Sequence, residues 1–303
     1  MIQARYEAAQ AVRAATMTET SLQLEEESGF TFILKIASNL AKKPKPRQAD
    51  NQPSAGVTGA KKNPNPFLPP ERELFVCYLS STHSLVLNKY NIVPHHSLII
   101  TRNYEPQERS LTAADFEATM AVVRAMPKPY GGLAYFNCGP QSGASQPHKH
   151  IQVIPLPLIT GPKAQLGATH YCIPFQHSIE ETLAGVAAWS VTSVHSLPFI
   201  NFVARINVQK SSQLAETHAF MLRRAKEEVG QSDMNELSFN TLFTKDFMML
   251  IPRSKESYSS VFCNAMAFAG SFFVRNMDEL HAIREIGPLR ILSEVGFSKT
   301  SIN

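Results

Sequence analysis

The fold and the chemistry of this chain are both decided by residues 137–152, which run Asn137-Cys138-Gly139-Pro140-Gln141-Ser142-Gly143-Ala144-Ser145-Gln146-Pro147-His148-Lys149-His150-Ile151-Gln152. The apolar and polar alternation from residue 148 onward, closed by Pro155, predicts a strand over residues 148–154. Side chains alternate between the two faces of a strand, so His148, His150 and Gln152 share one face. Three polar groups on one face do not help a core, and they indicate a site.

The loop that precedes this strand has the composition of an anion-binding loop. Gly139, Ser142, Gly143 and Ser145 allow several backbone N–H groups to turn inward beside hydroxyl groups. A neutral imidazole aimed at such a nest can attack a phosphorus atom and divide one phosphoryl transfer into two easier steps. A His-x-His pair is also a common metal-ligand pair, but glutamine is a poor metal ligand, and the Gly/Ser loop favours the phosphate interpretation.

Around this segment the chain predicts an α+β fold with an antiparallel sheet, because strands and helices are mixed without strict alternation. The expected strands are 30–36, 74–79, 84–87, 98–101, 133–137, 148–154, 199–207, 239–243 and 248–251. The expected helices are a weakly amphipathic one in 1–28 and clearer ones at 111–126, 212–229, 278–286 and 289–295. Residues 42–70 are rich in Lys, Pro, Gly, Asn and Ser, which predicts a flexible, solvated basic loop.

Bulk composition excludes several classes of protein. The chain has 303 residues, 44% hydrophobic and 18% charged, as expected of a soluble globular protein. It has no apolar run long enough for a membrane span, no signal or transit peptide and no close cysteine pair, which predicts a cytoplasmic protein; a nuclear location is compatible with the same features. A net charge of +4 is too small to indicate nucleic acid binding.

The motif His-x-His-x-Gln after a Gly/Ser loop resembles the transferase branch of the histidine-triad superfamily, in which glutamine replaces the third histidine. Within that branch the chain resembles the diadenosine tetraphosphate phosphorylases, or ATP adenylyltransferases, from about residue 30 to 296. The segments that carry the resemblance are Leu40-Ala41-Lys42-Lys43-Pro44, Asn63-Pro64-Asn65-Pro66-Phe67-Leu68-Pro69-Pro70, Leu87-Asn88-Lys89-Tyr90-Asn91-Ile92-Val93-Pro94, Gly143-Ala144-Ser145-Gln146-Pro147-His148-Lys149-His150 and 240–253.

This resemblance implies that diadenosine tetraphosphate is split by phosphate into ADP and ATP through an AMP–histidine intermediate. His150 would be the nucleophile, His148 would orient the pocket, and Gln152 would bind a phosphoryl oxygen. The further substrate contacts it implies are Lys43, Asn88, Lys89, Asn137, Gly143, Ala144, Ser145, Gln146, Asn240, Met248 and Arg253. No protein-ligated metal is implied, although Mg²⁺ can accompany the substrate's phosphates, and no nucleic acid or membrane partner is expected.

The resemblance also implies a histidine-triad-like antiparallel sheet with flanking helices in residues 1–185. A C-terminal α/β region in residues 190–303 would pack onto it as one compact unit. Met248 in an apolar strand is as readily a core residue as a ligand contact. Phe247 stands where the family pattern has tryptophan, which weakens the case for a stacking contact at that position.

Three other functions remain open at this level. A histidine-triad hydrolase would let water discharge the intermediate, but Gln152 cannot transfer a proton as a third histidine could. A hexose-1-phosphate uridylyltransferase shares the same motif and is disfavoured only by the flanking segments. A nucleotide-binding protein without turnover is the third.

Overall fold

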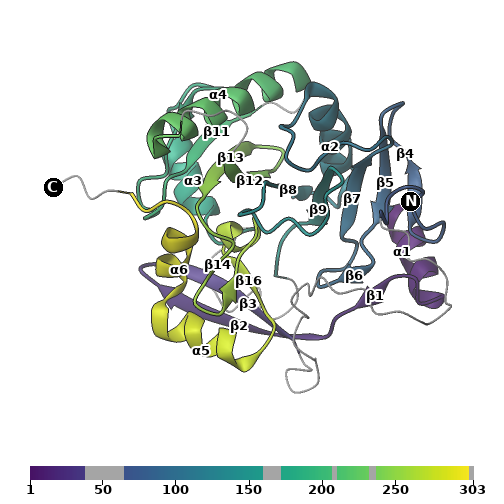
Figure 1. The fold of residues 1–303 in the computed structure, drawn as a ribbon, viewed down its shortest axis with the longest axis horizontal. Coiled ribbons are helices and arrows are strands. Elements are labelled where there is room, and N and C mark those ends of the chain that lie inside the picture. The colour runs from purple at the N-terminus through teal and green to yellow at the C-terminus, as the bar shows by residue number, and fades with distance from the viewer. Residues whose placement is uncertain (38–64, 160–171, 207–209, 232–236, 300–303) are drawn as a thin grey trace, which may run out of the picture.

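The computed structural model describes residues 1–37, 65–159, 172–206, 210–231 and 237–299 (Figure 1). In this part of the chain a nine-stranded sheet forms the centre, and every neighbouring pair is antiparallel. Its order is β10 (Val191–Thr192), β11 (Phe202–Arg205), β13 (Phe247–Arg253), β12 (Ser238–Phe243), β8 (Gly132–Cys138), β9 (His150–Pro155), β7 (Ser97–Thr101), β5 (His83–Leu87) and β4 (Phe75–Tyr78). Because β12 pairs with β8, a single sheet joins the two halves of the chain.

One face of this sheet is covered by helices α2 (Ala113–Ala125) and α4 (Ser211–Val229), which lie side by side along it (Figure 1). Ile151 and Val153 of β9 point into the apolar layer beneath these helices. Helix α2 begins at a capping box, in which the Thr112 hydroxyl accepts from the Asp115 N–H while the Asp115 carboxylate accepts from the Thr112 N–H. Lys149 alternates with His150, so it also faces this side.

The opposite face is covered in part by a three-stranded sheet and three helices. Strand β3 (Phe30–Ala37) pairs antiparallel with β2 (Thr20–Glu27) and parallel with β16 (Ser271–Val274). The helices of this layer are α3 (Gln176–Leu183), α5 (Met277–Ile286) and α6 (Pro288–Val295). Beyond this layer, a cavity lies against β9, β7 and β5, and His150 and Gln152 face it.

The smaller elements complete the described chain. They are α1 (Ile2–Ala11), β1 (Thr16–Met17), β6 (Tyr90–Asn91), β14 (Ser257–Tyr258), β15 (Val261–Phe262) and the short 3₁₀ helix η2 (Ala267–Ala269). Strand β1 pairs parallel with β6, so the N-terminal arm braces the turn that carries Asn88 and Lys89. None of the described helices combines the length and the apolar composition needed to cross a bilayer.

The predicted α+β class and antiparallel sheet are confirmed, and α2, α4, α5, α6, β12 and β13 lie where the sequence placed them. The helix predicted in 1–28 is wrong beyond residue 11, because residues 20–27 form β2. The two-residue turn Ser28-Gly29, with φ of 52° and 82°, closes a tight β-hairpin with β3. The predicted strand 148–154 begins later, at His150, since His148 makes only an isolated bridge to Pro106.

Candidate active site

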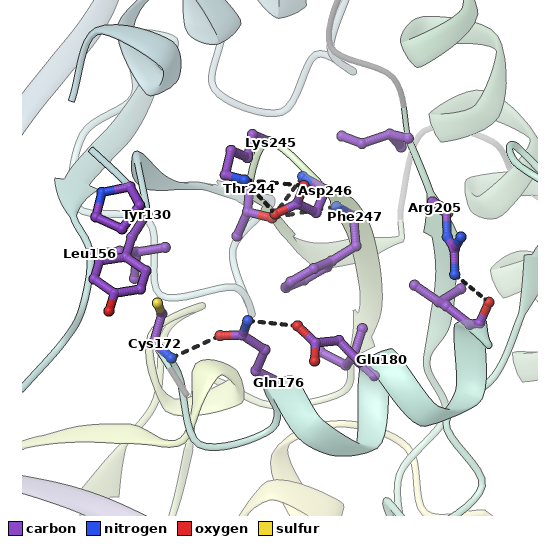
Figure 2. A pocket seen from close by; sticks show the side chains of 14 residues that line it. Tyr130, Leu156, Cys172, Gln176, Glu180, Arg205, Thr244, Lys245, Asp246 and Phe247 are labelled. Atoms are coloured by element: carbon purple, nitrogen blue, oxygen red, sulfur yellow. Dashed lines mark hydrogen bonds and ion pairs between the residues drawn. The ribbon is translucent and has the colours of Figure 1, made fainter. Parts of the chain in front are cut away.

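A cavity beside α3 is not the site that the sequence predicts. It has a volume of about 420 Å³ and lies among α3, the end of β11 and the β12–β13 turn, with both acidic and basic side chains around it (Figure 2). Phe247 lines it, and none of the predicted contacts does. Phe247 is 4% exposed, so this ring packs beside that cavity rather than at the His150 site.

A second cavity of about 280 Å³ lies on the open face of β9, β7 and β5. It brings together six predicted site residues from three segments of the chain: Asn88, Lys89, Ser145, Gln146, His150 and Gln152. Phe67 and Leu98 supply apolar wall. Phe67, near the end of the predicted loop 42–70, is only 7% exposed and packs against both histidine rings, so this end of the loop is not solvated; the flexibility of the loop stays a prediction. Residues 42–64 of that loop lie outside the described residues.

His150 is held in the form that a nucleophile needs. Its backbone N–H donates to Gln107 Oε1 at 2.8 Å, and its ring Nδ1 lies 2.8 Å from the His148 carbonyl oxygen. A carbonyl oxygen can only accept, so Nδ1 carries the proton and Nε2 keeps its lone pair. Burial lowers the pKa of His150 to about 4, which keeps the ring neutral near pH 7.

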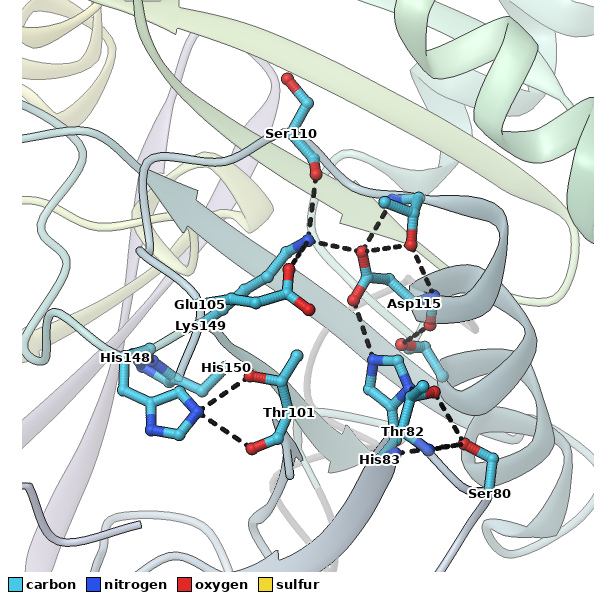
Figure 3. A network of polar contacts seen from close by, with 12 residues as sticks. Ser80, Thr82, His83, Thr101, Glu105, Ser110, Asp115, His148, Lys149 and His150 are labelled. Carbon is cyan, nitrogen blue, oxygen red and sulfur yellow. Dashed lines mark hydrogen bonds and ion pairs between the residues drawn. The ribbon is translucent and has the colours of Figure 1, made fainter. Parts of the chain in front are cut away.

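His148 supports this geometry from beside the cavity and does not line it. Its Nε2 donates toward the Thr101 carbonyl and hydroxyl oxygens at 2.9 and 2.8 Å, as Figure 3 shows. Its Nδ1 then accepts from the Asn65 amide at 3.1 Å. Burial lowers the pKa of His148, so this ring is also neutral. The geometry fits the orienting role expected of His148.

Gln152 is oriented by a chain of hydrogen bonds that begins at Asn88. The Asn88 amide donates to His96 Nδ1 at 3.1 Å, and His96 Nε2 donates to the Tyr135 hydroxyl at 3.2 Å. Tyr135 in turn donates to Gln152 Oε1 at 2.9 Å. Burial raises the pKa of Tyr135, so its hydroxyl stays protonated, and lowers that of His96 to about 4, so its ring is neutral and carries a single N–H, which the Asn88 bond places on Nε2. Because Oε1 is occupied, the amide NH₂ of Gln152 is the end available to a phosphoryl oxygen.

The Gly/Ser loop is held in place by the backbone carbonyl of Ser142, which points inward and accepts two hydrogen bonds. The Ser142 oxygen accepts from Asn240 Nδ2 at 2.9 Å and from Arg253 Nη1 at 3.2 Å. In a trans peptide the N–H points opposite to the C=O, so the Gly143 N–H turns outward. Among the described residues, no hydrogen bond is donated by the backbone N–H of residues 143–146. These groups can form the anion nest that the sequence predicts.

Gly143 cannot be replaced without moving this loop. Its φ is +79°, and an added Cβ would lie 2.8 Å from the Cys263 carbonyl oxygen and 2.9 Å from Asn264 Cβ. The loop therefore packs directly on the segment that follows β15. Ala144 is half-buried beside it, while Ser145 is exposed and lines the cavity.

Three predicted substrate contacts lie beneath the loop instead of in the cavity. Asn137, Asn240 and Arg253 are between 0% and 2% exposed. Asn137 Oδ1 accepts from Asn240 Nδ2 at 2.8 Å and from the Ala265 N–H at 3.0 Å. Arg253 also donates to Asn240 and to the backbone carbonyls of residues 255, 263 and 295. Their position is that of a scaffold beneath the loop, and the direct substrate contact expected from the sequence stays a prediction.

Met248 lies still farther from the chemistry. It is 0% exposed and belongs to the apolar layer beneath α2 and α4, on the face of the sheet opposite His150. This is the position of a core residue, the alternative that its apolar strand leaves open in the sequence.

At the cavity mouth, by contrast, Lys89 is half-exposed and its ammonium lies 2.7 Å from the Glu71 carboxylate. Lys43 lies outside the described residues.

Comparison with known protein families agrees with this arrangement. Residues 1–169 match the family model described as the Ap4A phosphorylase N-terminal domain, where Ap4A is diadenosine tetraphosphate, and residues 195–298 match the ATP adenylyltransferase C-terminal domain. The chain belongs to the Ap4A phosphorylase family. The division at residues 185–190 that the sequence suggests stays a prediction, and the shared sheet crosses it.

Two curated relatives from Saccharomyces cerevisiae are similar along most of their length. Diadenosine 5',5'''-P1,P4-tetraphosphate phosphorylase 2 is 26% identical over 281 residues, 82% of this chain and 81% of the relative. Protein APA1 is 23% identical over 304 residues, 94% of this chain and 88% of the relative. The crystal structure of yeast Ap4A phosphorylase Apa2 with AMP superposes with a TM-score of 0.76 at 23% identity, covering 99% of this chain and 97% of that one. These values establish a common fold.

Several residues that shape this Ap4A phosphorylase site were not predicted. Gln107 is 1% exposed and joins His150 to Asn137, because its Nε2 donates to the Asn137 carbonyl at 2.7 Å. Tyr135 controls Gln152, and Phe67 covers the histidines. Sequence alternation could have placed Tyr135 on the polar face of its strand, but nothing local marks Gln107, which comes from an irregular loop.

Proposed function

We propose that this member of the Ap4A phosphorylase family splits diadenosine tetraphosphate with inorganic phosphate, using His150 as a covalent nucleophile. The observation that supports it best is the fixed tautomer of His150, in which Nδ1–H is bound to the His148 carbonyl and Nε2 has a free lone pair. Nε2 has no hydrogen-bond partner among the described residues. Ser145, Gln146 and Gln152 line the same cavity, and the backbone N–H groups of residues 143–146 donate to no other described residue.

In the first half-reaction, His150 Nε2 attacks the α-phosphorus and the P–O bond to the remaining triphosphate breaks. ATP leaves, and AMP stays bound to His150 through a P–N bond. The loop N–H groups and the Gln152 amide donate to the non-bridging oxygens as their charge builds up. A neutral ring is required, and burial keeps the pKa of His150 at about 4.

In the second half-reaction an oxygen of inorganic phosphate attacks the same phosphorus, the P–N bond breaks, and ADP leaves. Gln152 can hold the phosphoryl group but cannot accept a proton from the attacking group. Phosphate dianion brings its own nucleophilicity, whereas water would need a general base. The amide at position 152 therefore supports phosphate as the acceptor.

The remaining assignments extend this proposal. ATP, ADP and phosphate are the small-molecule partners, with Mg²⁺ accompanying their phosphates and no metal held by protein ligands. Asn88 and Lys89 bind the nucleoside end, and Lys43 binds the far phosphates through its charge. We place the enzyme in the cytoplasm, where its four free cysteines would stay reduced.

The test is to trap the intermediate. Wild-type protein incubated with α-³²P-labelled diadenosine tetraphosphate, in the absence of phosphate, should retain label in a bond that is labile in acid and stable in alkali. Addition of phosphate should release the label as ADP. His150→Ala should lose the label and nearly all turnover, while the control His177→Ala, at a side chain that is 54% exposed, should keep both. Turnover at the wild-type rate in His150→Ala would reject the nucleophile assignment.

A further inference from the structure

A buried ionic network lies directly behind the nucleophile. Lys149, the residue between the two histidines, is 1% exposed on the α2 side of the sheet. Its ammonium lies 2.6 Å from Asp115 Oδ2, 3.0 Å from the Ser110 carbonyl oxygen and 3.5 Å from Glu105 Oε2 (Figure 3). No step of the phosphorolysis uses this charge, since the network and the cavity lie on opposite faces of β9.

The peptide group between His148 and Lys149 connects this network to the nucleophile. Its N–H donates to the Glu105 carbonyl at 2.7 Å, and its C=O accepts the Nδ1–H of His150 at 2.8 Å. Rotation of this one peptide would lengthen both bonds together, because the two groups point in opposite directions. The tautomer and the aim of the His150 ring thus depend on the orientation of the peptide.

The Asp115 carboxylate is itself held in place, so its contact with the Lys149 ammonium restrains the peptide. One carboxylate oxygen accepts from the Thr112 N–H at 2.7 Å in the cap of α2, and the other accepts from His83 Nε2 at 2.9 Å. Helix α2 packs on β8 and β9. Any movement of the Lys149 backbone would pull its ammonium away from this anchored carboxylate.

A role in stability alone accounts poorly for such a pair. Desolvation of two buried charges offsets most of their attraction, and apolar side chains of similar size often stabilise a fold equally well. A pair with defined geometry is more useful for fixing the position of the chain segment that carries it.

We propose that Lys149 and Asp115 are positioning residues, which lock the 148–149 peptide so that His150 presents Nε2 in line with the α-phosphorus. This inference rests on the proposed function of His150 as nucleophile. It predicts that loss of the pair affects the chemical step and leaves substrate binding intact.

The test uses the double variant Lys149→Met with Asp115→Asn, which removes both charges together and leaves neither unpaired. Single-turnover transfer of AMP to the protein should slow by about 100-fold, the typical effect of a 1 Å misplacement, with KM within about threefold of wild type. Val123→Ala, which removes apolar volume from the buried face of α2, is the matched control for lost stability and should keep the wild-type rate. A folded double variant with the wild-type rate would overturn the proposal, as would a fall in rate that the control reproduces at equal thermal midpoint.

A second readout does not depend on activity. In ¹⁵N-histidine-labelled wild-type protein, the His150 signals, identified by their loss in His150→Ala, should show a protonated Nδ1 and an unprotonated Nε2. The double variant should show a mixture of the two tautomers. If wild-type protein fails to take up AMP but this change appears, the proposed function fails and the positioning role stands. An unchanged tautomer in the double variant would refute the positioning role.

Discussion

Replacement of Tyr135 by phenylalanine tests how Gln152 is aimed. The substitution removes one hydroxyl from a side chain that is 4% exposed, and with it the 2.9 Å bond to Gln152 Oε1. Without this bond the amide can turn over and offer oxygen instead of NH₂ to the substrate. The lost interaction is a hydrogen bond to a charged phosphoryl oxygen, worth about 1.5–3 kcal/mol. At about 1.4 kcal/mol per tenfold in rate, the expected loss is between about 10-fold and 150-fold.

His96 determines where the loss in rate falls between these two limits. Its ring donates to Tyr135, and interaction with the Gln152 side chain opposes the lowering of its pKa by burial. In the variant its Nε2–H can therefore donate to Gln152 Oε1 and hold part of the amide population in place. We expect a fall in kcat of about 10-fold, near the lower limit, together with a modest loss of stability.

The assay is steady-state phosphorolysis of diadenosine tetraphosphate, with ADP and ATP separated by chromatography. Tyr104→Phe is the control, since this 55% exposed ring contacts His148 but takes no part in the chain to Gln152. A Tyr135→Phe protein that is folded and retains wild-type kcat would refute the orientation argument. Equal loss in both variants would point instead to altered packing around the histidines.

Three further predictions address the loop, the buried histidines and the acceptor. Arg253→Lys should lower the free energy of unfolding by about 3 kcal/mol, because a lysine cannot satisfy all the carbonyls that the guanidinium contacts, and it should raise KM because the loop loosens. Thermal denaturation and steady-state kinetics measure the two effects, with the exposed Arg290→Lys as control. An unchanged KM would mean that the loop holds its shape without Arg253. Burial lowers the pKa of His96, His150 and His218 to about 4, so between pH 6.5 and 4 the unfolded chain binds more protons than the folded one. The free energy of unfolding should therefore fall as pH falls, by at most about 1.4 kcal/mol per pH unit for each histidine. Urea denaturation at pH 7 and pH 5 measures this loss, and equal midpoints would contradict the burial of neutral rings. Gln152→His should raise the ratio of AMP to ADP formed at fixed phosphate, because an imidazole can act as general base for water with an effect of ~100-fold or more; an unchanged ratio in an active variant would mean that cavity shape excludes water.

The sequence was sufficient to place the elements whose two ends are marked by specific capping or breaking residues. Helix α2 could be placed because Thr112, Asp115 and Pro127 mark its two ends by capping and chain geometry. Strand β2 was missed because Leu, Gln and Glu favour helices, and only the Ser28-Gly29 turn indicated a hairpin. Pairing with β3 then outweighed the local preference.

The cavity residues could be predicted where their side chains are polar on a face that would otherwise be core. This holds for His150 and Gln152, which line the cavity as alternation on β9 requires. It fails for β12 and β13, whose residues are buried on both faces of the sheet. In such strands alternation does not separate a core residue such as Met248 from a site residue. It also cannot show that Asn240 and Arg253 face the loop from below.

The burial of Arg253 explains why the C-terminal half belongs to the active site without lining the cavity. Its guanidinium has no carboxylate partner among the hydrogen bonds of the described residues and is satisfied by carbonyl and amide oxygens alone. A buried cation of this kind favours carbonyl groups that point at it, and Ser142 supplies the one that belongs to the Gly/Ser loop. Turning that carbonyl inward turns the next N–H outward. In the proposed function, the C-terminal half acts on the substrate through the orientation of the 142–143 peptide, as Lys149 acts on the nucleophile through the 148–149 peptide.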